Sequence, residues 1–244
     1  MGIALKKTMG LLGRQLDDLL DLLYPPVCGL CGHPADSDDR LICQRCWESI
    51  EGPEAPYCSG CRQLLQDRLK CPVCHPAPMT VFSLGYYDGP LQTIVHDLKF
   101  KSLKPLANNI GRRLAERITP YLDRLKPDLI VPVPLHDSRW YGRGFNQSEE
   151  IAAGMGKILG IPVLGDVLYV ARKTKQQARL PASQREANVR GAYAVDDPGA
   201  ALDGKIVLLV DDVTTTGATL RENERVLLQA SATKIVAAVA ATAL

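Results

Sequence analysis

Apolar residues follow one pattern before about residue 80 and a different one after it. In the first stretch, leucines recur at helical spacing, and aspartates lie on the opposite side of the expected helix. These leucines are Leu12, Leu16, Leu19, Leu20 and Leu23. This spacing predicts one amphipathic helix within residues 1–25, ended by Pro25 and Pro26. Because its polar side is acidic, we expect this helix to pack on its own protein rather than on a membrane surface.

From about Val81 onward, stretches with strand and helix patterns alternate, which is typical of an α/β domain with a mostly parallel sheet. Strands are predicted at residues 81–86, 129–133, 167–170, 205–210 and 235–239. Helical stripes are predicted at residues 91–98, 106–122, 151–159 and 219–229. The sequence therefore predicts three parts: a helix over residues 1–25, a small module over 26–78 and an α/β domain over 79–244.

Composition narrows the class of protein. The chain has 244 residues, 46% of them hydrophobic and 23% charged, with a formal net charge of +2, which excludes a disordered or strongly polyanion-seeking chain. No window of 18 uninterrupted apolar residues occurs, so we expect no membrane span. Aspartates break the leucine-rich start in a way that a signal peptide does not tolerate, and we expect a cytoplasmic protein.

Cysteines mark the small module. All eight occur as Cys-x-x-Cys pairs, at Cys28 and Cys31, Cys43 and Cys46, Cys58 and Cys61, and Cys71 and Cys74. In a reducing compartment this spacing favours zinc over a disulfide scaffold or redox-active pairs. Eight thiolates form two four-sulfur sites, and a zinc ion with four protein ligands keeps no position open for substrate. We therefore expect two structural zinc ions.

The spacing also bears on which pairs share a metal. Consecutive pairing leaves 11 and 9 residues between the pairs of each site, enough for two short ribbons. We favour this double ribbon over an interleaved cross-brace, which the sequence does not exclude. His33 and His75 lie beside the cysteines, and because four sulfurs already fill each site we expect both to be spare surface histidines.

Candidate chemistry concentrates after the aliphatic run at 205–210. Asp211 and Asp212 follow it directly, and a loop rich in hydroxyl groups comes next, consisting of Thr214, Thr215, Thr216, Gly217, Ala218 and Thr219. Ligands of open α/β sheets bind at the carboxyl ends of strands, and a glycine-containing loop before a helix can hold a phosphate group. The Gly-Lys-Ser/Thr of a Walker loop is missing. Adjacent carboxylates suit vicinal hydroxyls or magnesium, so the pattern indicates a sugar phosphate rather than a nucleoside triphosphate.

These residues resemble a known family. The segment Val210-Asp-Asp-Val-Thr-Thr-Thr-Gly-Ala-Thr219 is similar to the phosphoribosyl-pyrophosphate loop of type I phosphoribosyltransferases, whose fold is a mostly parallel twisted sheet flanked by helices. The wider arrangement resembles the ComF competence-protein family, including its GntX-like members. That resemblance rests on the cysteine pairs and on Tyr87-Asp-Gly-Pro90, Leu98-Lys-Phe-Lys101, Val131-Pro-Val-Pro-Leu-His136 and Arg143-Gly-Phe-Asn-Gln147.

The resemblance implies a role for each part of the loop. Asp211 and Asp212 would hold the ribose hydroxyls, and residues 214–219 would wrap the 5-phosphate of phosphoribosyl pyrophosphate, which is bound with magnesium. Pro134 and Leu135 would form the tip of a pyrophosphate loop. Basic side chains that we expect to meet phosphate charge are Arg139, Arg143 and Lys99. The implied reaction is displacement of pyrophosphate at ribose C1, with the rate carried by positioning and electrostatics.

Residues 172–190, the basic segment, hold six Arg or Lys against the single acidic Glu186. By the resemblance this segment is a flap that closes over pyrophosphate; the alternatives are a contact strip for single-stranded DNA, which needs more aromatic residues, and an ordinary solvated loop. Five residues follow the predicted strand 235–239, so we expect no separate C-terminal hood that reads a nucleobase. Either the zinc module or the region near Tyr86 and Tyr87 supplies the acceptor pocket, or the substrate is not a nucleobase.

Two classes of function therefore stay open. The first is a phosphoribosyltransferase with an unidentified acceptor, connected with DNA uptake. The second is a non-catalytic competence factor that retains the pocket as a ligand site and binds single-stranded DNA or other competence proteins. The intact loop and the paired aspartates favour the first class.

Overall fold

The computed structural model describes residues 24–35, 39–66, 69–74, 78–135, 144–172, 174, 180–197 and 200–243. The chain forms two compact units, Met1–Ser49 and Ile50–Leu244. The leucines of the helix expected within residues 1–25 lie outside the described residues. The boundaries expected at residues 25 and 78 stay predictions; by compactness, the second half of the cysteine module belongs to the same unit as the sheet.

The first unit is organised around a buried aspartate. Asp39 Oδ1 accepts hydrogen bonds from the amides of Leu41 and Ile42, at 3.2 and 3.1 Å, and Asp39 Oδ2 accepts one from Trp47 Nε1 at 2.5 Å. Trp47 lies on the short helix α2, Gln44–Glu48. Because these bonds satisfy the buried carboxylate, they fix the turn that precedes α2.

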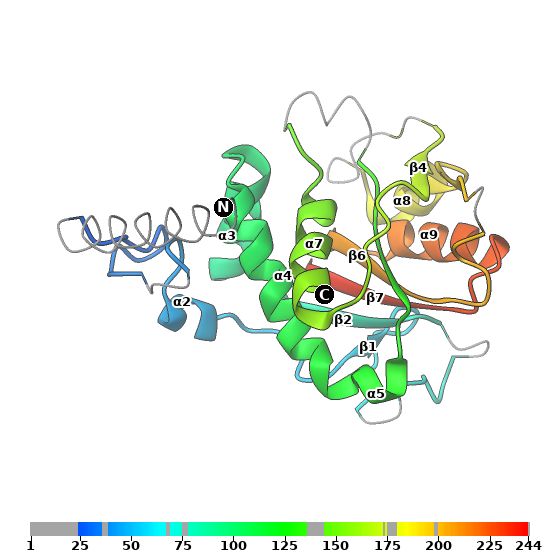
Figure 1. Cartoon of the computed structure of the whole chain (residues 1–244), viewed down its shortest axis with the longest axis horizontal. Coiled ribbons are helices and arrows are strands. Elements are labelled where there is room, and N and C mark those ends of the chain that lie inside the picture. Colours follow the sequence, from blue (N-terminus) through cyan, green and yellow to red (C-terminus); the bar gives the residue numbers. More distant parts are fainter. Residues whose placement is uncertain are drawn as a thin grey trace, which may run out of the picture. The chain divides into compact units, whose positions relative to one another are not determined.

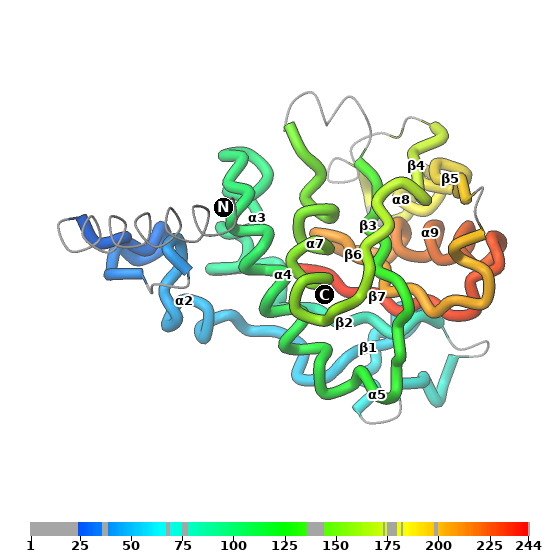
Figure 2. The backbone as a smooth tube through the Cα atoms, viewed as in Figure 1, coloured from blue at the N-terminus to red at the C-terminus, as the bar shows by residue number. Residues whose placement is uncertain are grey.

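A five-stranded sheet in the order β1-β2-β7-β6-β3 forms the centre of the second unit (Figures 1 and 2). Its strands are β1 (Tyr57–Cys58), β2 (Thr80–Tyr86), β3 (Leu129–Pro132), β6 (Ile206–Thr214) and β7 (Lys234–Thr242). The pairs β2–β7, β7–β6 and β6–β3 are parallel, and the short edge strand β1 is antiparallel to β2. The α/β class with a mostly parallel sheet is thus confirmed, and the aliphatic strand β6 lies inside the sheet as the sequence predicts.

Helices cover both faces of this sheet. One side carries α3 (Gly89–Phe100), α4 (Lys104–Ile118) and α7 (Gln147–Leu159), and the other carries α9 (Ala218–Gln229), as Figure 1 shows. The remaining elements are η1 (Thr119–Tyr121), α5 (Leu122–Leu125), α8 (Ala182–Val189) and a two-stranded antiparallel ribbon of β4 (Leu168–Val170) and β5 (Tyr193–Val195). Both α8 and the ribbon lie on the α9 side.

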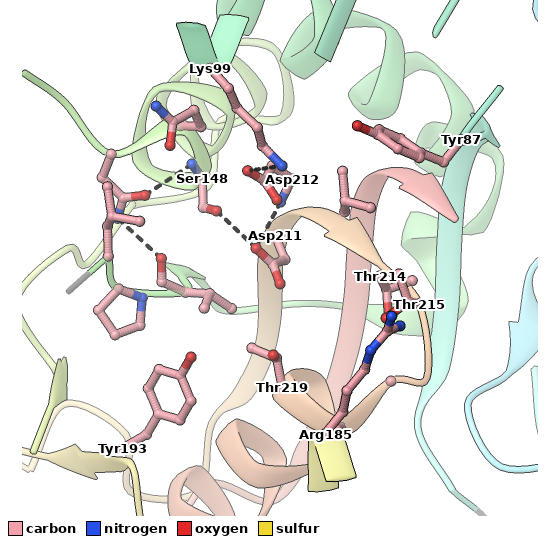
Figure 3. Close-up of a pocket in the computed structure, with 18 of the residues that line it drawn as sticks. Tyr87, Lys99, Ser148, Arg185, Tyr193, Asp211, Asp212, Thr214, Thr215 and Thr219 are labelled. Carbon is pink, nitrogen blue, oxygen red and sulfur yellow. Dashed lines mark hydrogen bonds and ion pairs between the residues drawn. The ribbon is translucent and has the colours of Figure 1, made fainter. Parts of the chain in front are cut away.

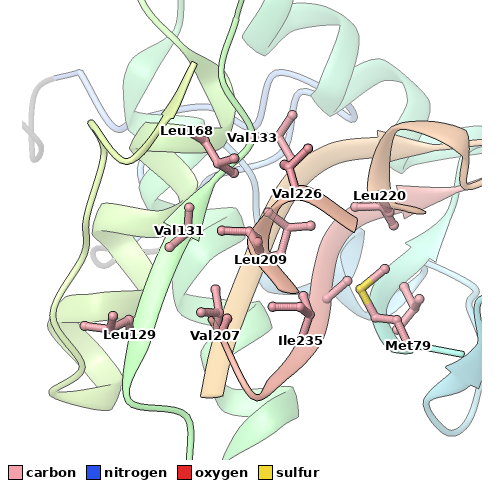
Figure 4. Close-up of a cluster of buried hydrophobic side chains, with 14 of the residues drawn as sticks. Met79, Leu129, Val131, Val133, Leu168, Val207, Leu209, Leu220, Val226 and Ile235 are labelled. Atoms are coloured by element: carbon pink, nitrogen blue, oxygen red, sulfur yellow. The ribbon is translucent and has the colours of Figure 1, made fainter. Parts of the chain in front are cut away.

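The core on the α9 face follows strand alternation. Val207 and Leu209 of β6 pack there with Val131 of β3 and Ile235 of β7 (Figure 4). Because side chains alternate along a strand, the intervening Leu208, which is also buried, faces the other layer of helices. Burying both faces of β6 holds its carboxyl end in a fixed position, and that end carries the paired aspartates.

The contact between α4 and α7 depends on a glycine. A Cβ atom at Gly111 would clash with the carbonyl of Ile151 and lie 3.0 Å from the amide nitrogen of Met155. The absence of a side chain therefore lets the two helices approach closely. This contact fixes α7, whose first turn lines the site described below.

Three predicted boundaries are wrong. The strand expected over 205–210 continues to Thr214 because it pairs with β7 along its length, so Asp211 and Asp212 lie within β6 and do not follow it. The helix expected over 106–122 ends at Ile118, because Pro120 follows and the chain continues as η1 and α5. The last strand continues beyond Val239 to Thr242, since the small residues that follow pair with β2 and β6 on both sides. Among the described residues, no helix has the length and apolarity needed to cross a lipid bilayer.

Candidate functional site

A pocket of about 350 Å³ lies at the carboxyl edge of the sheet (Figure 3). Strand β6, the loop after it and the start of α9 form one wall, and the ends of β2, β3 and α3 with the start of α7 form much of the rest. Its lining includes Tyr87, Lys99, Phe100, Pro134, Leu135, Asn146, Ser148, Arg185, Tyr193, Asp211, Asp212, Thr214, Thr215, Gly217, Ala218 and Thr219. Most residues that the sequence singles out for binding thus share one cavity, at the place where open α/β sheets bind their ligands.

Asp211 is the buried acid of the pocket. Its Oδ1 accepts hydrogen bonds from Ser148 Oγ at 3.1 Å and from the Asp212 amide at 2.8 Å. Burial, followed by the neighbouring charge of Asp212, raises the pKa of the Asp211 carboxyl to about 7. The site therefore holds a carboxyl group that gains or loses its proton near neutral pH.

Asp212 forms an ion pair with Lys99. The distance from Lys99 Nζ to Asp212 Oδ2 is 2.8 Å, and 16% of each side chain is exposed. Lys99 comes from the last turn of α3, where the sequence predicts a phosphate contact. Lys99 lines the pocket, with its ammonium group paired to the Asp212 carboxylate.

The loop of residues 214–219, which we call the phosphate loop, leads into helix α9. Gly217 has a φ of 74° and is the N-cap of this 12-residue helix, a conformation that glycine adopts without strain. Thr216 is absent from the pocket wall: its Oγ1 accepts a hydrogen bond from the Ala218 amide at 3.4 Å, and its carbonyl accepts one from Arg221 Nη1 at 2.8 Å. The other members of the loop line the pocket, and the positive end of the α9 dipole lies beside them.

Pro134 and Leu135 line the pocket just after β3. The Val133 amide donates to the Val210 carbonyl at 2.8 Å, so this segment leaves the sheet next to the paired aspartates. Arg139 and Arg143, the two arginines expected to follow it, lie outside the described residues.

The first turn of α7 also lines the pocket, although its sequence had indicated no role in binding. Asn146 caps the helix by accepting from the Ser148 amide at 3.1 Å, and its Nδ2 donates to the Val133 carbonyl at 3.1 Å. Ser148 in turn donates to Asp211. These bonds connect the ends of β3, α7 and β6. The N-cap pattern Asn146-Gln-Ser-Glu-Glu150 was the available sequence signal for a helix start at this point.

Part of the basic segment reaches the pocket. Arg185 lines it from α8, with its Nε donating to the Leu180 carbonyl at 3.1 Å. Lys173, Lys175 and Arg179 lie outside the described residues. The described part of the basic segment therefore reaches the pocket at Arg185 of α8.

The ends of the basic segment are anchored. Arg172 Nη2 donates to the carbonyls of Asn188 and Arg190, at 3.1 and 2.8 Å. The Gly191 amide donates to Glu222 Oε1 of α9 at 2.8 Å. Helix α9, which begins at the phosphate loop, thus also supports the base of this segment.

The cysteines form two clusters with consecutive pairing, as the sequence favours. The first cysteine cluster is Cys28, Cys31, Cys43 and Cys46, and the second is Cys58, Cys61, Cys71 and Cys74. The thiol sulfurs of each cluster lie within 4.8 Å of one another, and all eight cysteines are free of disulfides. The first cluster belongs to the first compact unit and the second to the unit of the sheet.

The sulfur positions fit tetrahedral zinc. Zinc–sulfur bonds of about 2.3 Å place tetrahedral sulfurs roughly 3.8 Å apart. The sulfurs of Cys28 and Cys46 are 3.7 Å apart, and those of Cys61 and Cys71 are 3.5 Å apart. A hydrogen bond from the His33 amide lowers the pKa of Cys31 to about 5, and one from the Cys74 amide lowers the pKa of Cys71 to about 6, whereas burial raises the pKa of Cys46 and Cys58. Thiolates are the form that binds metal.

We expect the purified chain to carry two zinc ions. Cys28→Ser should remove one of them and unfold the first unit only, because metal binding and folding are one event in such small sites. Metal analysis by mass spectrometry, with near-ultraviolet circular dichroism, checks both points. A chain that holds fewer than one zinc, when purified without chelators, would contradict the assignment.

Comparison with known proteins agrees with this geometry. The double zinc ribbon family matches residues 19–75, and the phosphoribosyl transferase domain family matches residues 103–243. Competence protein F of Haemophilus influenzae is 31% identical over 193 residues, covering 76% of this chain and 83% of that protein. DNA utilization protein YhgH of Salmonella typhimurium is 29% identical over 221 residues, covering 88% of this chain and 96% of that protein.

Among solved structures, the glutamine phosphoribosylpyrophosphate amidotransferase from B. subtilis matches with 25% identity and a TM-score of 0.37, covering 55% of this chain and 25% of that chain. A mostly parallel sheet with paired carboxylates and a threonine-rich loop at its carboxyl edge defines a phosphoribosyltransferase-type domain. The chain belongs to the ComF family, in which a double zinc ribbon precedes that domain.

Proposed function

We propose that the pocket binds phosphoribosyl pyrophosphate with magnesium and that the chain transfers the phosphoribosyl group to an acceptor. The observation that carries this proposal is that paired carboxylates and a phosphate loop line the same cavity. Its volume of about 350 Å³ lies at the lower end of the range for small-molecule sites. The proposed ligand needs both features, one for its ribose hydroxyls and one for its 5-phosphate.

The phosphate loop and the carboxylates are proposed to bind different parts of the ligand. Backbone amides at the start of α9, with the hydroxyls of Thr214, Thr215 and Thr219, are proposed to hold the 5-phosphate. Asp211 and Asp212 are proposed to accept hydrogen bonds from the 2- and 3-hydroxyls of the ribose. A hydrogen bond to a charged carboxylate is stronger than one between neutral groups, so this pair would hold the sugar ring most tightly above the pKa of Asp211, about 7.

Magnesium fits the oxygen chemistry of the same wall. It is usually held by one or two carboxylates together with substrate phosphates, and the Asp211–Asp212 pair supplies carboxylates at the edge of the cavity. When bound, the ion would neutralise charge on the pyrophosphate. Lys99, Arg139 and Arg143 are proposed to meet the same charge, next to the loop that contains Pro134 and Leu135.

The proposed reaction is a displacement at ribose C1. The bond from C1 to the pyrophosphate oxygen breaks, pyrophosphate leaves with the electron pair, and the acceptor nucleophile forms the new bond at C1. The chain holds the reacting groups together and supplies positive charge where negative charge develops. The basic segment, which brings Arg185 to the pocket, is proposed to close over pyrophosphate and exclude water.

Tyr87 and Phe100 mark the proposed acceptor side of the pocket. Tyr87 follows the end of β2, where its amide donates to the Thr242 carbonyl at 2.8 Å, and Phe100 ends α3. Both residues line the pocket, and this supports the proposal of an acceptor site near Tyr87. Aromatic walls suit a planar acceptor.

A connection with DNA uptake forms the second part of the proposal. Relatives of this chain bear the names Competence protein F and DNA utilization protein YhgH. We place the chain in the cytoplasm, where free thiolates persist for zinc, and we propose single-stranded DNA and competence proteins as partners. A non-catalytic DNA-binding factor that keeps the pocket as a ligand site is the second candidate; the relatives' names and the basic segment favour it.

A turnover assay separates the two candidates. The chain is mixed with phosphoribosyl pyrophosphate, magnesium and, in turn, each nucleobase and single-stranded DNA, and pyrophosphate release is followed. Acceptor-dependent release supports the transferase. Saturable binding without release for every acceptor supports the ligand-site candidate.

Replacing Arg179, Arg185 and Arg190 by alanine tests the basic segment. For a flap over pyrophosphate, the triple variant should bind phosphoribosyl pyrophosphate about 10-fold more weakly, because charge-assisted hydrogen bonds to phosphate are lost. Its affinity for single-stranded DNA should stay that of the parent. Calorimetry and fluorescence anisotropy measure the two affinities, with Arg112→Ala and Arg124→Ala combined as a control.

For a DNA strip, the same triple variant should lose DNA affinity instead. Its log–log salt slope should flatten by about 0.7 for each lost phosphate contact with a single strand. A variant that matches the parent in ligand affinity, DNA affinity and salt slope would show that the segment is a solvated loop and that both functional interpretations are wrong.

A further inference from the structure

The second cysteine cluster is continuous with the sheet. Its first ligand, Cys58, belongs to β1 and pairs with Thr80 of β2, and the Ser59 amide donates to the Met79 carbonyl at 2.9 Å. The Tyr57 hydroxyl donates to Thr242 Oγ1 of β7 at 3.0 Å, and this bond is buried. The cluster is therefore attached to β2 and to the end of β7, which pairs with β6 where the phosphate loop begins.

Arg62 occupies a strained position in this cluster. In the first cysteine cluster the residue after the Cys-x-x-Cys pair is Gly32, whose φ is 71° and whose amide donates to the Cys28 carbonyl at 2.9 Å. In the second cluster Arg62 takes the same place, with a φ of 62° and its amide 2.9 Å from the Cys58 carbonyl. Glycine adopts this left-handed conformation freely, whereas a residue with a side chain does so at a cost in free energy. This strain indicates that the side chain of Arg62 has a function.

The guanidinium of Arg62 reaches the phosphate loop. Its Nη2 donates to the carbonyl of Thr215, which lines the pocket, and its Nη1 donates to the carbonyl of Ala243 at 3.2 Å. Ala243 in turn donates its amide to the Thr214 carbonyl at 2.9 Å. On the same side, a Cβ atom at Gly217 would lie 3.8 Å from the Ser59 carbonyl. The loop between the zinc ligands thus supports the phosphate loop from outside the pocket.

We propose that Arg62 is a positioning residue for the phosphate loop and that metal binding at the second cysteine cluster is thereby coupled to phosphate binding in the pocket. The coupling rests on the proposed function, because it requires that the pocket take a phosphorylated ligand. It concerns the second cluster alone; the first lies in the other compact unit.

The coupling follows from the planarity of the peptide bond. Holding the Thr215 carbonyl fixes the plane of the 215–216 peptide and thereby the backbone of Thr215, which lines the pocket beside Thr214 and Gly217. The zinc ligands on both sides of Arg62 hold its backbone, and without the metal the cluster does not keep its fold. Loss of zinc would therefore release the peptide plane and weaken phosphate binding. By reciprocity, a bound phosphate ligand would slow the loss of zinc by way of the same contact.

Substitutions at Arg62 separate positioning from charge and from folding. Arg62→Gly introduces the residue type that the chain has at the equivalent position, Gly32, so the variant should retain two zinc ions. It should bind ribose 5-phosphate about 10-fold more weakly, because both guanidinium hydrogen bonds are lost. Arg62→Lys keeps the charge but not the planar fork, and it should stay several-fold weaker than the parent. Arg45→Ala, which changes an arginine of helix α2 in the first compact unit, should leave the affinity for ribose 5-phosphate unchanged.

Zinc release tests the reciprocal effect without any activity measurement. In a Cys28→Ser chain, which retains only the second metal site, saturating ribose 5-phosphate should slow zinc transfer to a chelator about 10-fold. Adding Arg62→Gly to this chain should abolish the slowing. Both rates are followed with a chromophoric chelator at fixed ionic strength.

The outcomes distinguish the coupling from the proposed function. If the parent binds ribose 5-phosphate, and Arg62→Gly binds it equally well with no effect of the sugar on zinc release, the coupling is wrong and the proposed function stands. Full recovery by Arg62→Lys would overturn positioning in favour of charge alone. If the parent binds neither ribose 5-phosphate nor phosphoribosyl pyrophosphate, the proposed function fails, and the coupling fails with it.

Discussion

Replacing both carboxylates of the pocket, Asp211→Asn with Asp212→Asn, should weaken the binding of phosphoribosyl pyrophosphate by at least about 100-fold. Each substitution removes a charged acceptor for a ribose hydroxyl, and a hydrogen bond to a charged group contributes about 1.5–3 kcal/mol. Asparagine matches aspartate in shape and at position 211 retains an oxygen for the Ser148 hydroxyl, so strand β6, which continues through both residues to Thr214, should stay folded. Calorimetric titration of the variant with magnesium present measures the loss.

Two comparisons make this result specific. Asp123→Asn removes an exposed carboxylate from α5, away from the pocket, and should bind like the parent. Circular dichroism and a zinc content of two should show that the double variant is folded. Unchanged affinity in a folded double variant would mean that the likeness of this loop to a phosphoribosyl-pyrophosphate loop is structural only.

The single substitution Asp211→Asn should stabilise the fold at alkaline pH. In the folded chain the pKa of Asp211 is raised to about 7 from the ordinary value of 3.8, so the folded state binds this proton more tightly than the unfolded state does. Stability should therefore fall as pH rises from about 4 to about 7 and stay low above that range. Because asparagine does not titrate, the variant should regain at pH 8 the stability that the parent loses there.

Urea unfolding at pH 5.5 and pH 8, with zinc present, measures this difference. The variant should exceed the parent in free energy of unfolding by a much larger margin at pH 8, whereas Asp123→Asn should give the same small difference at both values. A margin for Asp211→Asn that does not change with pH would show that the carboxyl titrates normally. A margin that grows with pH would show that Asp211 lowers the stability of the parent at alkaline pH. That loss would then occur at a residue that we propose binds the ribose.

Most of the elements follow from apolar spacing. The stripe that predicts a helix over 151–159 corresponds to α7, and Gly160 ends it in the left-handed conformation with a φ of 68°. The errors have local causes: Leu122 continues the spacing of α4 although Pro120 interrupts the helix, and the alanines after Val239 are equally compatible with a strand or a helix end. Sheet pairing, which decides the second case, involves residues distant in sequence.

Some residues of the site could likewise be predicted from the sequence, and others could not. Asp211, Asp212 and the phosphate loop are contiguous in sequence, so their common position at one strand end was predictable. Ser148 and Arg62 reach the same region from segments 63 and 153 residues away from the groups that they contact, and only the tertiary fold brings them there. Loop length favoured the consecutive pairing of the cysteines without excluding an interleaved one, whereas the attachment of the second cluster to the sheet depends on the β1–β2 pair.

Calorimetric titration of the full chain with phosphoribosyl pyrophosphate, in the presence and absence of magnesium, tests the central claim most directly. We expect saturable binding of one ligand per chain that is strengthened by magnesium, competed by ribose 5-phosphate and lost in the Asp211→Asn, Asp212→Asn variant. A zinc-loaded, folded chain that gives no saturable heat with this ligand, or that binds it equally well after both carboxylates are removed, would contradict the account.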